Sequence, residues 1–232
     1  MAAKPASPEG RGISQTATRA EKAVQRSYFS RIVYRDPRDP VVSAYADPKL
    51  KFLWDHVKTD GGILDVGCGN GTFTLRLSQW SATVVGLDQS LHLLSHNAHK
   101  PLVVGDSTSL PFRSGAFDLV FEANVLHHVG ERSGMVRELA RVSRRYVAIL
   151  EPNRINPVMF LFALLVRAER GVLASSVGRL TSEIGEAGLR MRACITTGMI
   201  SQNNTPRFLI PVLRRFDRPF RFGEYIMCVA EK

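Results

Sequence analysis

The sequence predicts an α/β protein built on a doubly wound, mostly parallel β-sheet with an antiparallel strand at its C-terminal end. Short apolar runs alternate with helix-like segments from residue 61 onward, as expected of right-handed βαβ crossovers. The first run ends in GCGNG, which is typical of a strand-to-helix turn. Acidic residues follow three successive runs, where a parallel sheet of this type binds its ligands.

Composition indicates an ordinary globular domain. The 232 residues are 44% hydrophobic and 22% charged. Cys68, Cys194 and Cys228 are scattered, so we expect neither a disulfide framework nor a zinc cluster, and this favours a reducing compartment. The longest apolar run, Val158–Val166, is about half of a membrane span, and the polar N-terminus lacks a secretory signal. We therefore expect a soluble, cytoplasmic protein.

The net charge of +10 is concentrated at the two ends of the chain. Residues 1–40 carry +4 and residues 151–232 carry +5, whereas residues 41–150 carry only +1. Such charge raises encounter rates with anions such as nucleic acid, acidic lipid or phosphorylated substrates. A solvated, arginine-rich surface with no partner explains it equally well.

The chain divides into three parts. Residues 1–20 are small, polar and rich in proline and glycine, which predicts a disordered tail. Residues 21–58 form a helical cap, because Leu50, Leu53, Trp54 and Val57 have the spacing of an amphipathic helix after a DPRDP turn. Aromatic residues near position 30 close over a ligand or pack on the sheet. Residues 59–232 form the main domain, with candidate lid insertions near 155–178 and 198–222.

The elements of the main domain follow from its apolar pattern. Five strands alternate with three helices up to residue 150, and a helix and two further strands follow. The last two strands can pair antiparallel, because no helix-length pattern separates them. We expect strands at Ile63–Val66, Thr83–Leu87, Pro101–Val104, Phe117–Phe121, Tyr146–Leu150, Arg190–Thr196 and Tyr225–Ala230, and helices at Thr72–Trp80, Leu91–Ala98, Arg132–Val142 and Leu180–Ala187.

The glycine-rich turn LDVGCGNG is the strongest signal. Alternating glycines let backbone N–H groups approach a ligand at the positive end of a helix. A dinucleotide fingerprint requires a third glycine where Thr72 stands, and the Gly-Lys-Ser/Thr of a P-loop is absent. Asp65 would repel a pyrophosphate and would suit a cationic ligand. A tight turn without a ligand is the alternative for these glycines.

Two further acids lie where such a ligand would extend. Asp88 ends the second predicted strand, where an acid accepts both hydroxyls of a ribose. Asp106 follows the third strand, where a carboxylate accepts from an exocyclic amine. A helix N-cap is the alternative for Asp88, and an Asx-turn is the alternative for Asp106.

Four stretches carry a family resemblance. DVGCGNG, GLDQS, GDSTSLPF and FDLVFEANVLHHV, in this order and spacing, resemble the class I S-adenosylmethionine-dependent methyltransferases over residues 60–151. The likeness is to the small-molecule branch that includes quinone-biosynthesis enzymes. It implies a Rossmann-like fold and S-adenosylmethionine as cofactor. The residues that it implies at the cofactor are Asp65, Gly67, Cys68, Gly69 and Gly71 at the methionine part, Asp88 and Gln89 at the ribose, Asp106 and Ser107 at the adenine, and Glu122 and Ala123 alongside.

A general base is useful if the methyl acceptor is a hydroxyl or an acidified carbon. His127 is the candidate, because adjacent residues on a helix diverge by about 100° and only one of His127 and His128 can face the site. Val125 and Val129 would mark the packed side, from which His127 points away. The alternative is a histidine that only shapes the cavity. We expect no metal.

The expected function is methyl transfer to an O, N or C nucleophile of a small molecule by in-line displacement. Glu151-Pro152-Asn153 positions the acceptor or forms a turn. One alternative is an RNA methyltransferase that uses the basic segment 207–222, and another is a non-catalytic cofactor-binding or assembly protein. Peripheral contact with a membrane also remains open, and the sequence does not predict an oligomeric state.

Overall fold

The fold comes from a computed structural model that describes residues 24, 25 and 27–232. The predicted tail, residues 1–20, and the start of the predicted cap lie outside the described residues. Within the described part, no helix is both long enough and apolar enough to cross a bilayer.

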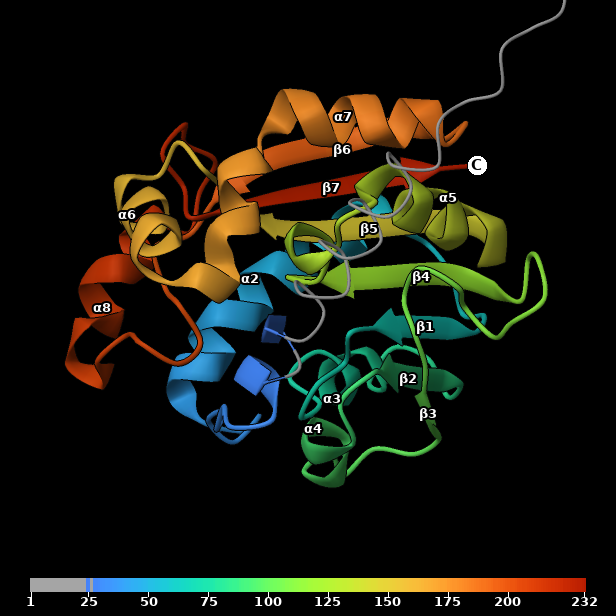
Figure 1. Ribbon diagram of the computed structural model, residues 1–232, viewed down its shortest axis with the longest axis horizontal. Coiled ribbons are helices and arrows are strands. Elements are labelled where there is room, and N and C mark those ends of the chain that lie inside the picture. Colours follow the sequence, from blue (N-terminus) through green and yellow to red (C-terminus); the bar gives the residue numbers. More distant parts are fainter. Residues whose placement is uncertain (1–23, 26) are drawn as a thin grey trace, which may run out of the picture.

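A seven-stranded sheet forms the centre of the molecule, in the order β3-β2-β1-β4-β5-β7-β6 (Figure 1). The first five strands along the chain pair in parallel, and β7 pairs antiparallel with both β5 and β6. The predicted fold class and the antiparallel C-terminal pairing are confirmed. The strands are β1 Ile63–Val66, β2 Val84–Asp88, β3 Leu102–Val104, β4 Phe117–Ala123, β5 Ser143–Pro152, β6 Arg190–Thr197 and β7 Tyr225–Glu231.

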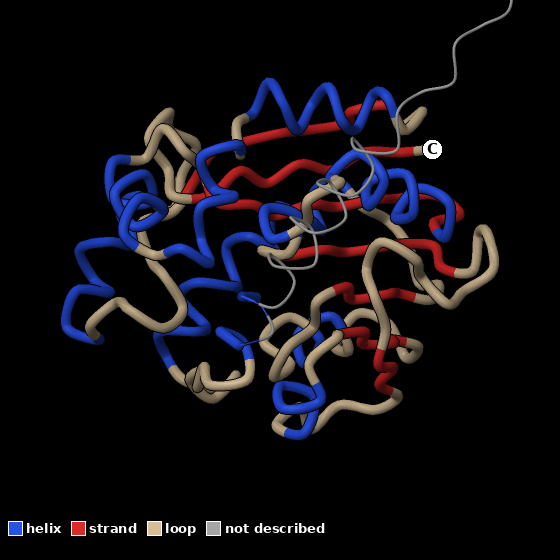
Figure 2. The backbone as a smooth tube through the Cα atoms, in the orientation of Figure 1, coloured by secondary structure: helices blue, strands red, loops and turns tan. Residues whose placement is uncertain are grey.

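Helices cover both faces of the sheet (Figure 2). The α-helices are α2 Pro40–His56, α3 Thr74–Leu77, α4 Leu91–Ser95, α5 Arg132–Val142, α6 Pro157–Leu165, α7 Val177–Glu186 and α8 Ile210–Leu213. Short 3-10 helices are η1 Leu126–His128, η2 Arg167–Ala174, η3 Arg207–Leu209 and η4 Arg214–Phe216.

Local side chains set the helix boundaries. Helix α2 begins at Pro40, at the end of the predicted DPRDP turn, because Asp39 accepts a hydrogen bond from Val41 N at 2.8 Å and proline suits the first helical position. Helix α4 ends before the predicted Ala98, since the buried side chain of Asn97 donates to Gly69 O at 3.3 Å and so ties the glycine turn.

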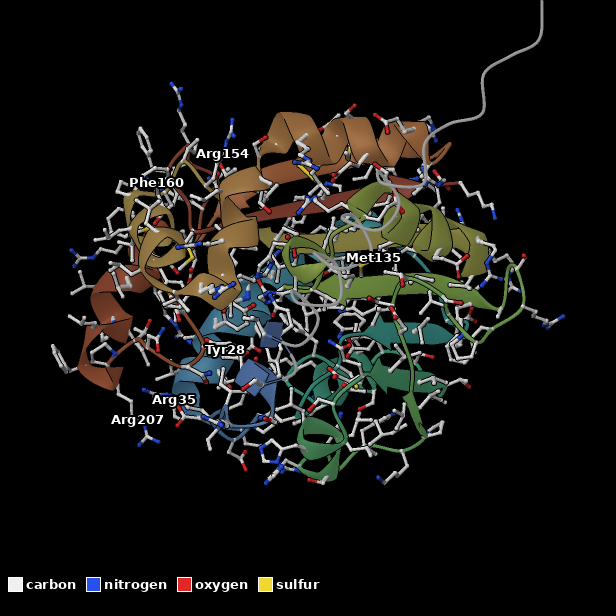
Figure 3. The ribbon with its side chains drawn as sticks, viewed as in Figure 1. Tyr28, Arg35, Met135, Arg154, Phe160 and Arg207 are labelled. Carbon is white, nitrogen blue, oxygen red and sulfur yellow. A yellow bond between two sulfur atoms is a disulfide. The ribbon has the colours of Figure 1, made fainter. Side chains whose placement is uncertain are left out.

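The core has one layer on each face of the sheet. Tyr45 and Leu53 of α2 pack against Phe121, Tyr146 and Met227. On the other face, residues of α5 and α7 pack against Leu64, Val120 and Cys228; Met135 of α5 is labelled in Figure 3. Because both faces are covered, the central strands β1, β4 and β7 are buried along almost their whole length, whereas the edge strand β6 alternates at its start.

The prediction of no disulfide is wrong. Cys194 and Cys228 are register partners on β6 and β7, and a disulfide joins them. Their separation of 34 residues forms no motif, so only the antiparallel pairing brings them together. Cys68 is free and buried.

A buried arginine links α5 to α7. Arg132 donates to both carboxylate oxygens of Glu183, at 2.8 and 3.0 Å, and its Nη1 lies 3.6 Å from Glu151. We expect Arg132→Met to lower the free energy of unfolding in urea by about 3–5 kcal/mol, because it removes a buried cation that Glu183 and Glu151 share. The control, Arg137→Met, removes an exposed pair with Glu131 and should cost less than about 1 kcal/mol. Equal losses in the two variants would contradict this interpretation.

Candidate active site

A cavity of about 570 Å³ lies at the carboxyl edge of the parallel strands. One side is built by the glycine turn after β1 and by the ends of β2 and β4, and the other by η1, α6 and residues 28–34. The cavity therefore joins a polar, glycine-rich half to a half with apolar and aromatic walls. The walls include Gly67, Cys68, Gly69, Asp88, Gln89, Ser107 and Ala123 in the first half, and Tyr28, Phe29, Ile32, His127, His128, Met159, Phe162 and Tyr225 in the second.

The glycine turn requires its glycines for two different reasons. Gly67 has φ of +74°, and a Cβ there would lie 2.0 Å from Val125 Cγ2. Gly69 has φ of +49°, and a Cβ there would meet a single atom within 4 Å, Leu93 Cδ1 at 4.0 Å. The turn therefore packs tightly against η1 at Gly67 and leaves room for a ligand at Gly69.

Asp88 is held rigidly at the cavity wall. Its Oδ2 accepts from Gly69 N at 3.0 Å and its Oδ1 accepts from Ser90 N at 2.8 Å. Burial raises the pKa of this carboxyl, and the two backbone donors oppose that effect. Each oxygen keeps a further acceptor position, so the group can accept two ligand hydroxyls at once.

Seven of the predicted cofactor residues line the cavity: Gly67, Cys68, Gly69, Asp88, Gln89, Ser107 and Ala123. Asp65, Gly71, Asp106 and Glu122 do not. Asp65 is buried beneath the turn and accepts from Thr74 Oγ1 at 2.6 Å, and burial raises its pKa to about 7. Asp106 is exposed and accepts from Thr108 N at 2.9 Å, which is the Asx-turn alternative. The structure thus gives these two acids local partners outside the cavity.

Glu122 stabilises the start of η1 by hydrogen bonds to its backbone. Its Oε1 accepts from Val125 N at 2.6 Å and from Leu126 N at 3.1 Å, while its buried Oε2 has no hydrogen-bond partner among the described residues. Burial and the charge of Glu151 raise its pKa well above the ordinary value. Glu122 therefore supports the turn that carries the two histidines.

His127 is held between two carboxylates. Its Nδ1 lies 3.1 Å from both oxygens of Glu151, and its Nε2 lies 3.3 Å from Glu169 Oε2. Burial alone would lower the pKa of His127, but Glu151 and Glu169 outweigh it and raise the pKa to about 10. Both ring nitrogens therefore donate, and this arrangement does not fit the predicted role of His127 as a general base.

His128 also reaches the cavity, so the prediction that only one of the two histidines faces it is wrong. The tight 3-10 turn of η1 brings the two rings to 3.8 Å between centroids. Nδ1 of His128 lies 3.2 Å from Ala168 O, and donation there leaves Nε2 as an acceptor. Burial and the neighbouring His127 lower its pKa to about 3, which keeps the ring neutral.

His127, His128 and Glu169 could also hold a metal ion. Their ligand atoms lie within 4.8 Å of one another, and they form the candidate metal group of the described residues. In this structure the hydrogen bond from His127 to Glu169 occupies two of these three atoms. His127 and Glu169 thus form a hydrogen-bonded ion pair beside the neutral His128, and the expectation of no metal stays a prediction.

Sequence reasoning missed the residues that come from distant segments. Glu169 lies in η2, 42 residues beyond His127, and Met159 and Phe162 come from α6. The one available signal was that Glu169 is the single acid between Glu151 and Glu183, in an otherwise basic and apolar stretch. Asn203 and Tyr225 carried no signal, since only the fold brings them to the cavity.

Comparison with known proteins agrees with this geometry. Residues 64–148 match the protein family described as "Methyltransferase domain". A malonyl-[acyl-carrier protein] O-methyltransferase of Legionella pneumophila is 42% identical over 89 residues, which are 34% of this chain and 31% of that protein. A demethylmenaquinone methyltransferase of Corynebacterium efficiens is 30% identical over 127 residues, which are 54% of this chain and 55% of the relative. The chain thus spans about a third to about half of the length of these curated relatives.

Solved structures share the fold. An S-adenosylmethionine-dependent methyltransferase from Thermotoga maritima has a TM-score of 0.66 at 14% identity, covering 83% of this chain and 91% of its own. A second one, from Mesorhizobium loti, has a TM-score of 0.60 at 18% identity, covering 82% of this chain and 100% of its own. At these identities the likeness concerns the fold.

Residues 64–148 match the methyltransferase domain family, and the fold is shared with solved S-adenosylmethionine-dependent methyltransferases, as the resemblance implied. The curated relatives that share it act on quinone and acyl-carrier substrates, as their names state. The cofactor of this class is S-adenosylmethionine, and the donor set fits it. Asp88 offers two acceptors for a ribose, and the open position at Gly69 leaves space for the ligand.

The ribose assignment predicts a defined loss of affinity. Calorimetry with S-adenosylmethionine should show that Asp88→Ala weakens binding by about 1–3 kcal/mol, the penalty for unmade charge-assisted hydrogen bonds. Asp55→Ala, at an exposed residue outside the cavity, should cost less than about 1 kcal/mol. Circular dichroism would verify that both variants fold. Undiminished binding in Asp88→Ala would remove the assignment.

The raised pKa of Asp65 should make the free energy of unfolding depend on pH. Its pKa is about 7 in the folded protein against 3.8 ordinarily, so between these values the folded state holds a proton that the unfolded state has lost. The free energy of unfolding should therefore fall as pH rises from about 4 to about 7, by up to about 4 kcal/mol from this group. Asp65→Asn keeps an acceptor for Thr74 and removes this dependence.

The measurement compares urea unfolding of the wild type and Asp65→Asn at pH 4 and pH 8. Burial also raises the pKa of Glu224 to about 7, but this contribution is common to both proteins and cancels in the difference. The asparagine variant should lose less stability than the wild type between the two pH values. Equal losses would show that Asp65 does not titrate in this range.

Proposed function

We propose that this protein transfers a methyl group from S-adenosylmethionine to a hydroxyl oxygen of a small, partly apolar molecule. The observation that carries the proposal is the two-sided cavity. A glycine turn with Asp88 forms one half, and aromatic and apolar walls with one free imidazole nitrogen, His128 Nε2, form the other. The quinone in the name of one relative supports a small, partly apolar acceptor, and the O-methyltransferase in the name of another supports an oxygen nucleophile.

Cofactor binding in this proposal uses the polar half of the cavity. S-adenosylmethionine supplies an activated methyl group on a sulfonium, so the protein must align an acceptor and exclude water. Gly69 and the rigid Asp88 hold the nucleoside side. Asp65, Gly71, Asp106 and Glu122 stay predicted cofactor residues, with Asp65 and Glu122 acting by supporting the turns above them.

Acceptor binding uses the other half. Tyr28, Phe29, Met159 and Phe162 offer apolar contact, and these walls exclude water from the reacting atoms. We assign to His128 the role of accepting a hydrogen bond from the acceptor hydroxyl, which turns a lone pair of that oxygen toward the methyl carbon. His128 Nε2 then takes the proton that the oxygen loses on methylation and passes it to solvent. The protonated His127 packs against His128 and positions its ring. The hydrogen bond from His127 to Glu169 joins η1 to η2 in the cavity wall. A cytoplasmic place of action belongs to the proposal, because S-adenosylmethionine is a metabolite of the cell interior.

Two variants test the assignment of His128. Release of S-adenosylhomocysteine is measured with metabolite extract and with a panel of phenols and quinols as acceptors. We expect His128→Ala to lower kcat/KM by roughly 10–100-fold, the cost of losing acceptor orientation, with cofactor affinity unchanged. The control, His92→Ala, removes an exposed histidine outside the cavity and should leave turnover unchanged.

The same assay separates the alternatives. Salt-resistant incorporation of methyl label into one RNA species, with none in small solutes, would replace the proposal with an RNA methyltransferase. Cofactor binding without turnover on any fraction would indicate a non-catalytic protein. Full activity in His128→Ala would leave the reaction but remove the role of His128.

A further inference from the structure

Helix α6 has two apolar sides. Its inner side, with Met159, Phe162 and the buried Ala163, faces the cavity and the core. Its outer side is exposed among the described residues, with Leu165 75% and Leu161 56% accessible. The exposed apolar residues of α6 are Val158, Phe160, Leu161, Leu164 and Leu165. A helix that is apolar all round is expected to be buried, so the outer side lacks a partner.

A second exposed apolar segment adjoins this helix. Residues 206–222 present Phe208, which is 78% exposed, together with Val212, Phe216 and Phe222. Asn156, the N-cap of α6, donates to Phe222 O at 2.8 Å and so links the two segments. Figures 1 and 3 place α6 with Phe160, and α8 with the neighbouring Arg207, at the same end of the molecule. We call residues 154–170 and 206–222 the apolar–arginine face.

The charge of this face has a single sign. Its exposed arginines are Arg154, Arg167, Arg170, Arg207, Arg214, Arg215, Arg218 and Arg221, of which Arg207 pairs with Asp39 at the start of α2 at 2.8 Å. Its two acids, Glu169 and Asp217, are partly buried, and Glu169 faces the cavity. The two segments thus carry exposed apolar side chains and exposed arginines but no exposed acid. This combination suits the interface of a bilayer that contains anionic lipid, because the apolar side chains can enter the acyl region while the arginines bind lipid phosphates.

We propose that the apolar–arginine face docks on an anionic lipid bilayer. A nucleic acid would use the arginines but would leave the exposed aliphatic side chains of α6 in water, so the two kinds of residue together favour lipid. Because α6 separates this face from the cavity, docking would bring a lipid-dissolved acceptor next to the cavity wall; this link, unlike the docking itself, rests on the proposed function. The acceptor class is then a lipid-soluble molecule that carries a hydroxyl.

The test is co-sedimentation of the full chain with vesicles. We expect binding to phosphatidylcholine vesicles that contain about a third phosphatidylglycerol, weaker binding in high salt, and little binding to phosphatidylcholine alone. Leu161→Ser/Leu165→Ser and Arg214→Glu/Arg215→Glu should each lower the partition coefficient at least about ten-fold. These side chains are exposed, so both variants should fold and bind S-adenosylmethionine as the wild type does.

Matched controls change the same chemistry elsewhere on the surface. Leu91→Ser/Val104→Ser removes two exposed apolar side chains, 69% and 54% accessible, and Arg113→Glu/Arg137→Glu makes the same charge change outside the face. Both should sediment like the wild type. Equal loss in a control and its matched variant would overturn the proposal, as would a wild type that binds RNA but no vesicle. Vesicle binding without cofactor binding would defeat the proposed function and leave docking intact.

Discussion

The structure around the active site depends on one buried carboxylate, that of Glu151 at the carboxyl end of β5. An ionised group in this position is stable only if cations and donors surround it. His127, Arg132 and Ser175 do so, at 3.1, 3.6 and 3.2 Å. These partners come from η1, α5 and the turn before α7, so neutralising one charge fixes three separate segments against the sheet.

The same network gives the two histidines different protonation states. Because Glu151 and Glu169 hold His127 as a cation, its proton is not free to move during a reaction. That positive charge, together with burial, keeps the adjacent His128 neutral. A pair of residues that look equivalent in the chain thus becomes a fixed donor beside a free acceptor, and the difference arises from carboxylates that lie 24 and 42 residues away.

Local patterns were enough to predict the glycine turn and Asp88 at the cavity, but not the cavity walls that come from distant segments. The strand, glycine turn and Asp88 lie within about one βαβ unit, so spacing alone indicates that they meet. Glu169 and Tyr225 reach the cavity through contacts between distant segments, and no periodicity encodes such contacts. The disulfide is a similar case, because Cys194 and Cys228 become partners only through the register of β6 and β7. The role of His127 was missed for the same reason.

Helix α6 lies between the cavity and the exposed apolar surface. Its inner residues close the cavity that the charge network shapes, and its outer residues form an exposed apolar surface with arginines around it. A helix that served only as a wall would gain solubility from polar residues on its outer side. Retaining leucine and phenylalanine there is costly unless that side also meets an apolar phase. The composition of this one helix therefore supports a lipid-soluble acceptor in the proposed reaction.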